Sequence, residues 1–187
     1  DRMDEAVMLL RRLLDGERVD HAGRFYTMRD ALCAPRPVQA RLPILIGGSG
    51  PRKTLRTLAR YGDAWNTSGR LDDVREREAI LRERCAEVGR DHREIERTLN
   101  VDMMIRDDPA EARAAWRAQQ EDPDDTTEPT WTVLCGPPAQ IADELRPFVE
   151  LGFRHVIIDL PAPYDAETIA RVGEVVAALA RPAEAAR

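Results

Sequence analysis

The chain has 187 residues, 43% of them hydrophobic, and a formal net charge of −6, from 34 Asp and Glu against 28 Lys and Arg. This length suits a single domain with a sizeable core, or part of a larger one. The sequence has no basic stripe with interleaved aromatic residues, which argues against nucleic-acid binding. Its apolar runs are too short to cross a bilayer, which argues against a membrane protein.

Cysteine usage and the first residues indicate a cytoplasmic protein. Cys33, Cys85 and Cys135 are odd in number and far apart, which favours a reducing compartment over a disulfide framework. Residues 1–5 do not resemble a signal peptide. Because the sequence lacks an initial Met and opens directly in a helical pattern, we expect it to be a piece of a longer chain.

Residues 1–42 are predicted to form a helix, a hairpin and a connector. Apolar residues spaced four, three and four apart predict an amphipathic helix over 3–14, which Asp15 and Gly16 end. Residues 17–30 alternate loosely and favour a small hairpin. Pro35, Pro37 and Pro43 then favour an extended connector.

From residue 43 to residue 180, short apolar strands alternate with helices. Four strand–helix units are predicted, at 43–61, 63–89, 98–120 and 155–180. A brief extended piece at 132–134 and an additional helix at 138–151, which Pro147 should kink, precede the last unit. We expect residues 121–129 to form a solvated loop and residues 181–187 a loose tail. The alternation predicts one α/β domain with a parallel sheet.

The apolar positions also mark two of the helices and the last strand. Leu55, Leu58 and Ala59 share one side of the helix at 51–61. Residues 155–160 have the composition of a buried strand. The last helix is marked by a spaced apolar set, with Asp165 as its N-cap; the set is Ile169, Val172, Val176 and Leu179.

A glycine-rich turn carries the strongest functional signal. The apolar run 44–46 stops at three glycines, and a helical pattern follows at once. Glycines allow close approach to a ligand, and a helix N-terminus offers unpaired N–H groups and positive potential. We therefore favour a site for a phosphorylated ligand over a tight turn with no ligand. The candidate binding residues are Gly47, Gly48, Ser49, Gly50, Lys53 and Thr54.

Two better-known phosphate motifs do not match this turn. Lys53 stands where a dinucleotide fingerprint needs its third Gly or Ala, and no acidic residue ends a second strand about 20 residues later. A Walker A sequence would end in Gly-Lys-Ser/Thr, which is absent. A nicotinamide-binding domain is therefore the weaker alternative, and a general phosphate cradle remains.

Other polar residues give weaker signals. Trp65 and Asn66 end a strand, where they could contact a flat ring, although a core role for the indole is at least as common. Asp159 closes the last strand, where we favour a turn-capping role over substrate binding. The three histidines, His21, His92 and His155, show no metal-ligand spacing, so no metal is expected.

Two blocks of the sequence, 43–50 and 54–66, resemble the bacterial luciferase-like monooxygenase family, and most closely its F420-dependent oxidoreductases. Further segments of the family are similar to five other stretches of this chain, at residues 3–14, 23–26, 35–39, 85–91 and 136–156. The resemblance covers nearly the whole chain.

The resemblance implies the carboxyl-terminal half of a TIM-type (β/α)₈ barrel, with its last four β/α units and a small hairpin insertion. It implies that Gly47–Gly50 and the start of the next helix lie near a cofactor phosphate, and that Asp63–Asn66 is a strand end facing the site. The amino-terminal half of such enzymes carries several catalytic side chains, so no catalytic residue is named.

Resemblance to this family implies an oxidoreductase that uses reduced coenzyme F420 for hydride transfer with a small organic substrate. An FMN-dependent monooxygenase is the alternative, since both cofactors carry a phosphate. A third hypothesis is a non-catalytic half barrel that binds anions or pairs with another chain, as in a homodimer, because open strand edges invite pairing.

Overall fold

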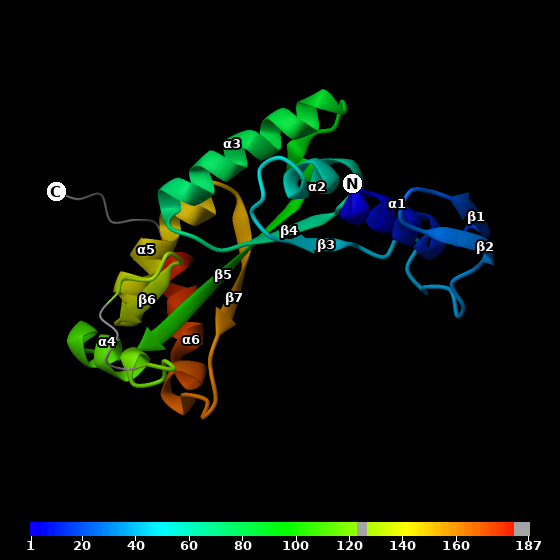
Figure 1. Ribbon diagram of the computed structural model, residues 1–187. Helices are drawn as coiled ribbons and strands as arrows, with labels where there is room; N and C mark the ends of the chain where they lie inside the picture. The colour runs from blue at the N-terminus through cyan, green and yellow to red at the C-terminus, as the bar shows by residue number, and fades with distance from the viewer. Residues whose placement is uncertain (123–126, 182–187) are drawn as a thin grey trace. The chain divides into compact units, whose positions relative to one another are not determined.

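A computed structural model describes residues 1–122 and 127–181 (Figure 1). The chain divides into two compact units. The first unit comprises residues 1–67 and 75–97, and the second comprises residues 68–74 and the chain from residue 98 onward. The expected single domain over 1–187 stays a prediction.

The first unit begins with a helix and a hairpin, as predicted. Helix α1 (Arg2–Leu14) is followed by the antiparallel strands β1 (Val19–Ala22) and β2 (Thr27–Ala31). The Glu5 carboxylate of α1 accepts hydrogen bonds from the backbone N–H groups of Phe25 and Tyr26, at 3.2 and 3.0 Å, and lies 3.1 Å from His21 Nε2. One carboxylate therefore fastens the hairpin turn to the helix.

The next elements form a parallel strand pair joined by a helix. Strands β3 (Leu45–Gly47) and β4 (Ala64–Thr67) pair over all three residues of β3, and α2 (Thr54–Tyr61) connects them. The predicted apolar side of α2 is confirmed, since Leu55, Leu58 and Ala59 are fully buried. Arg90 donates to the Ala59 and Gly62 carbonyls at 3.2 and 2.7 Å, which stabilises the carboxyl end of α2.

Helix α3 (Leu71–Glu87), the short η1 turn (His92–Glu94) and strand β5 (Glu96–Ile105) continue the chain. Within the first unit, Glu78 of α3 pairs with Arg97 of β5. Arg97 Nη2 and Nε lie 2.9 and 3.2 Å from the two carboxylate oxygens, and both side chains are buried. This bidentate pair joins α3 to the start of β5.

The second unit holds the remaining strands and helices, α4 (Pro109–Arg117), β6 (Val133–Gly136), α5 (Pro138–Glu150), β7 (Phe153–Asp159) and α6 (Ala166–Leu179). Strand β6 pairs with β5 in parallel, with Asp102 opposite Val133 and Ile105 opposite Gly136, and β7 also pairs with β5. Helices α5 and α6 pack against each other. The parallel α/β fold predicted from the sequence is confirmed.

The number of strand–helix units was predicted wrongly. The described residues contain five, because Val133–Gly136 is a full strand of the sheet followed directly by α5. The sequence suggested only a brief extended piece there. A four-residue strand bounded by Pro137 is too short to show a clear periodicity, and its identity depends on pairing with β5.

The buried strand expected at residues 155–160 was also predicted wrongly, and the apolar residues that mark the last helix are not all buried. Ile169 and Val176 of α6 are 53% and 63% exposed, whereas Thr168 and Val175 are buried. In β7 only Phe153 is buried. Apolar residues surround most of α6, so spacing alone does not reveal which side contacts α5. No helix in the described parts of the chain is long and apolar enough to cross a membrane.

Asp165 is the N-cap of α6, as predicted. It accepts hydrogen bonds from the Thr168 N–H at 2.8 Å and from Arg106 at 2.7 and 3.0 Å. The Arg106 guanidinium holds the pKa of Asp165 well below its usual value of 3.8. The hydrogen bonds from Thr168 lower this pKa further, whereas burial raises it. The charged form of Asp165 therefore stabilises the fold.

We expect Asp165→Asn to lower the free energy of unfolding by about 1–2 kcal/mol at pH 7. Asparagine caps helices as well as aspartate does, so the loss isolates the ion pair with Arg106. The pKa of Asp165 is lowered in the folded state. The contribution of its charged form to the free energy of unfolding is therefore complete above pH 3.8 and is lost as the pH falls from there through the folded-state pKa. Urea unfolding at pH 7, 5 and 3 measures it. An equal difference between the two proteins at pH 7 and pH 3 contradicts this origin.

Candidate functional site

The glycine-rich turn lies between β3 and α2 in the first unit. Its backbone is left-handed at Gly48, where φ is +115°, a conformation that side chains rarely adopt. The Gly48 N–H donates to the Asn66 carbonyl at 3.0 Å, and the Gly48 carbonyl accepts from the Trp65 indole at 2.9 Å. Both backbone groups of Gly48 are therefore used by β4, and the Gly48 N–H is not available to a ligand.

The next two backbone N–H groups remain available. In the parts of the chain that the structure describes, the N–H groups of Ser49 and Gly50 have no hydrogen-bond acceptor. Gly50 lies against Thr54, because a Cβ built at Gly50 would be 2.9 Å from Thr54 Oγ1. The turn therefore places Gly50, one of the two residues with an available N–H, close to the Thr54 hydroxyl group.

The charges around the turn favour an anion. Helix α2 has no acidic residue in its first turn, so nothing on the helix opposes the positive end of its dipole. Arg52 and Lys53 precede the helix and are exposed. The Lys53 side chain is 73% exposed, and its ammonium group lies 3.5 Å from an Asp1 carboxylate oxygen. Such an exposed pair is weak and leaves the ammonium group accessible to another anion.

The sequence left two roles open for Trp65, contact with a flat ring and packing in the core, and the structure shows the core role. Its side chain is fully buried. Asn66 is half-buried, and its carbonyl is the oxygen that accepts from Gly48. No local pattern in the sequence indicates these bonds. Aligning the two strands in register would have placed Gly47 opposite Asn66, with the turn beside Trp65.

Asp63 does not face this turn, although the family resemblance grouped it with Asn66. It precedes β4, at the end of the strand opposite to Asn66. Its carboxylate accepts from Arg11, from Arg41 at 2.9 Å and from the Ile44 N–H at 2.8 Å. Asp63 therefore anchors the connector that leads into β3.

The remaining polar candidates also have structural partners. Asp159 accepts from Asn100 Nδ2 at 2.6 Å, and Asp165 rather than Asp159 caps the following helix. Cys85 and Cys135 are buried free thiols, and burial raises the pKa of both. Within residues 1–122 and 127–181, no group of His, Cys, Asp and Glu side chains could hold a metal ion.

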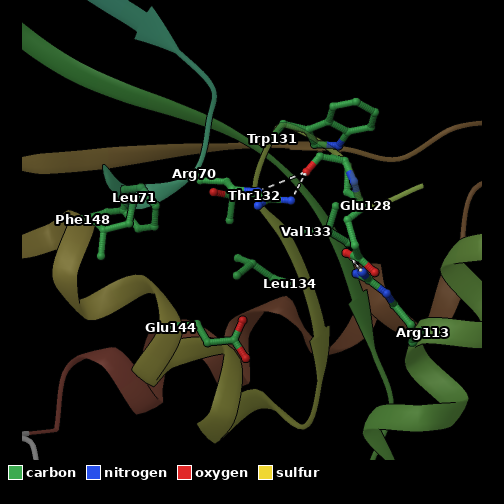
Figure 2. Close-up of a pocket in the computed structure, with 11 residues that line it drawn as sticks. Arg70, Leu71, Arg113, Glu128, Trp131, Thr132, Val133, Leu134, Glu144 and Phe148 are labelled. Carbon is green, nitrogen blue, oxygen red and sulfur yellow. Dashed lines mark hydrogen bonds and ion pairs between the residues drawn. The ribbon is translucent and has the colours of Figure 1, made fainter. Parts of the chain in front are cut away.

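The second unit contains a separate cavity of about 490 Å³ that sequence reasoning missed (Figure 2). Its apolar part includes Leu71, Leu134 and Phe148. Arg70 donates to the Pro129 carbonyl at 3.1 and 3.3 Å, and Arg113 pairs with Glu128 at 2.7 Å. These guanidinium groups are held by partners within the cavity wall.

The comparison with known families decides what kind of protein this is. Residues 1–120 match the family described as luciferase-like monooxygenase, which is more than half of the chain. The chain belongs to the luciferase-like monooxygenase family. The resemblance inferred from the glycine turn and its neighbours is thereby confirmed.

A similar curated relative in this family is the F420-dependent glucose-6-phosphate dehydrogenase of Kineococcus radiotolerans. It is 27% identical over 207 residues, which cover 97% of this chain and 60% of that protein. The chain thus spans about three fifths of the relative's length.

Two solved structures share the fold of this chain. An F420-dependent secondary alcohol dehydrogenase in complex with an F420–acetone adduct matches with a TM-score of 0.76 and 20% identity, over 95% of this chain and 61% of that one. A riboflavin lyase with modified FMN matches with a TM-score of 0.71 and 14% identity, over 95% and 56%. The chain therefore has the fold of part of a TIM-type barrel. That this part is the carboxyl-terminal one stays a prediction.

Proposed function

We propose that the protein is an oxidoreductase that uses reduced coenzyme F420 for hydride transfer with a small organic substrate. The turn from Gly47 to Thr54 would hold the cofactor phosphate. The observation that carries the proposal is the pair of available N–H groups at Ser49 and Gly50, beside the Thr54 hydroxyl, at a helix start with no acidic residue. Family membership and the F420 dependence of the curated relative support the choice of cofactor.

Each residue of the turn has a separate task in this proposal. Ser49 and Gly50 would donate backbone hydrogen bonds to phosphate oxygens, and Thr54 a hydroxyl hydrogen bond. Lys53 would add a mobile positive charge. Gly47 is exposed, with open space around its Cβ position, so it would allow close approach. When bound, the reduced deazaflavin supplies the hydride, and the protein supplies binding and orientation.

FMN is the second candidate cofactor, and the reaction would then be a flavin-dependent monooxygenation. The proposed contacts of the turn are all with a phosphate, which FMN and F420 both carry, so they fit either cofactor. The structural likeness to a riboflavin lyase with modified FMN is consistent with a flavin on this fold. A small-molecule substrate is part of both proposals, and a homodimer remains an untested expectation.

The test is a fluorescence titration of the natural protein with F420 and with FMN. We expect F420 to bind more tightly, and Gly48→Asp to weaken binding at least about tenfold, or 1.4 kcal/mol. The aspartate would strain a left-handed position and place a negative charge beside the phosphate.

Gly152→Asp is the matched control for this variant. It makes the same chemical change at another left-handed glycine, with φ +100°, in the second unit. It should lower stability and leave the dissociation constant unchanged. Failure of the natural protein to bind either cofactor refutes the proposed function.

A further inference from the structure

The indole of Trp65 makes an unusual contact with the glycine turn. Trp65 is fully buried on β4, and its Nε1–H donates to the Gly48 carbonyl at 2.9 Å. A buried indole N–H needs an acceptor. The acceptor here is the left-handed glycine that immediately precedes the two available donors of the turn.

This contact determines where the next backbone donor points. The Gly48 carbonyl and the Ser49 N–H belong to one peptide unit, which is planar, and only Ala34–Pro35 and Ala162–Pro163 are cis among the described residues. In a trans peptide the carbonyl and the N–H point in opposite directions. Because the indole holds the Gly48 carbonyl toward β4, the Ser49 N–H points away from β4.

The turn has little else to hold this orientation. Glycine at 47, 48 and 50 gives the backbone access to many conformations. The Gly48 N–H is fixed by the Asn66 carbonyl at 3.0 Å, but that bond does not set the direction of the following peptide. Without the indole bond, rotation of the peptide between Gly48 and Ser49 would turn the Ser49 N–H inward.

We propose that Trp65 is a positioning residue that aims the Ser49 N–H at a bound phosphate. The inference rests on the proposed function only for the identity of the ligand, the phosphate of a flavin or deazaflavin. Trp65 itself does not touch the ligand. Its effect is therefore specific to the phosphate and leaves contacts with the ring system unchanged.

The variant Trp65→Phe removes the donor and keeps an aromatic ring in the core. Trp116→Phe is the matched control, because Trp116 is 7% exposed and its indole donates to Asp102 at 2.8 Å in the second unit. Both variants should lower the unfolding midpoint. Only Trp65→Phe should weaken FMN binding, by about tenfold, while riboflavin, which lacks the phosphate, binds both variants and the parent protein equally.

A titration with inorganic phosphate, followed by amide NMR, tests the geometry without any cofactor. We expect phosphate to shift the Ser49 and Gly50 amide signals in the parent protein and in Trp116→Phe, with the Ser49 shift lost in Trp65→Phe. An unchanged Ser49 response in Trp65→Phe, or no response in the parent protein, overturns the inference. A normal phosphate response combined with no binding of F420 or FMN refutes the proposed function and leaves the inference standing.

Discussion

Replacing Glu78 by alanine is expected to lower the free energy of unfolding of the first unit by about 3–5 kcal/mol. The Glu78 side chain is 2% exposed and the Arg97 side chain 6%. Removing the carboxylate leaves a buried guanidinium with backbone carbonyls of His92 and Ile95 and the His92 ring as its remaining partners. Chemical denaturation, with hydrogen exchange of β5 amides as a local probe, measures the loss.

A double variant and a surface control test whether the loss in Glu78→Ala comes from the buried, unpaired charge. Glu78→Leu combined with Arg97→Met replaces the pair by apolar side chains and should recover most of the stability, because well-packed hydrophobic residues can substitute for a buried ion pair. Glu83→Ala changes an exposed glutamate of the same helix and should cost less than about 0.5 kcal/mol. A loss of similar size in Glu83→Ala and Glu78→Ala would show that the pair contributes nothing specific.

Much of the fold could be predicted from local sequence signals. Helix α1 is marked by its apolar spacing and ends where Gly16 adopts a φ of +83°. Helix α4 begins at Pro109, with Asp108 as a cap whose side chain accepts from the Ala110 N–H. Such signals are short-range, because a cap or a terminating glycine acts within one turn of the helix.

The errors concern features that depend on distant partners. Strand β6 is recognisable only through its pairing with β5, and the exposed side of α6 only through its packing on α5. Arg97 and Glu78 are 19 residues apart, and their pairing follows from the return of the chain from α3 into β5. Spacing within one element carries no information about such contacts.

The glycine-rich turn lies where the sequence predicted it, between β3 and α2, whereas its role as a binding site stays a prediction. The glycines and the following helix start are short-range signals, so they predicted a turn of the right kind. The direction of each N–H is set across two strands, by Asn66 and Trp65 on β4. The sequence could not show that Gly48 is used by the sheet while Ser49 and Gly50 remain available.

Asp63 is expected to be the second most sensitive position, with Asp63→Ala costing about 2–4 kcal/mol. Its carboxylate binds the buried Arg11, the Ile44 N–H at 2.8 Å and Arg41 at 2.9 Å. The alanine variant would leave a buried guanidinium and a backbone donor with fewer partners. Because Ile44 leads directly into β3, cofactor binding at the glycine turn should weaken as well.

The two arginines on this carboxylate provide an internal comparison. The Arg11 side chain is 10% exposed and that of Arg41 is 54% exposed, so Arg41→Ala should cost at most about 1 kcal/mol, well below Asp63→Ala. Burial raises the pKa of Asp63, but the Ile44 N–H and the two arginines outweigh it and lower the pKa below 3.8. The contribution of the charged Asp63 carboxylate to the free energy of unfolding is therefore complete above pH 3.8 and declines as the pH falls through the folded-state pKa. Acid unfolding of the parent protein and of Asp63→Asn should converge at low pH, whereas a constant gap would assign the loss to packing instead of charge.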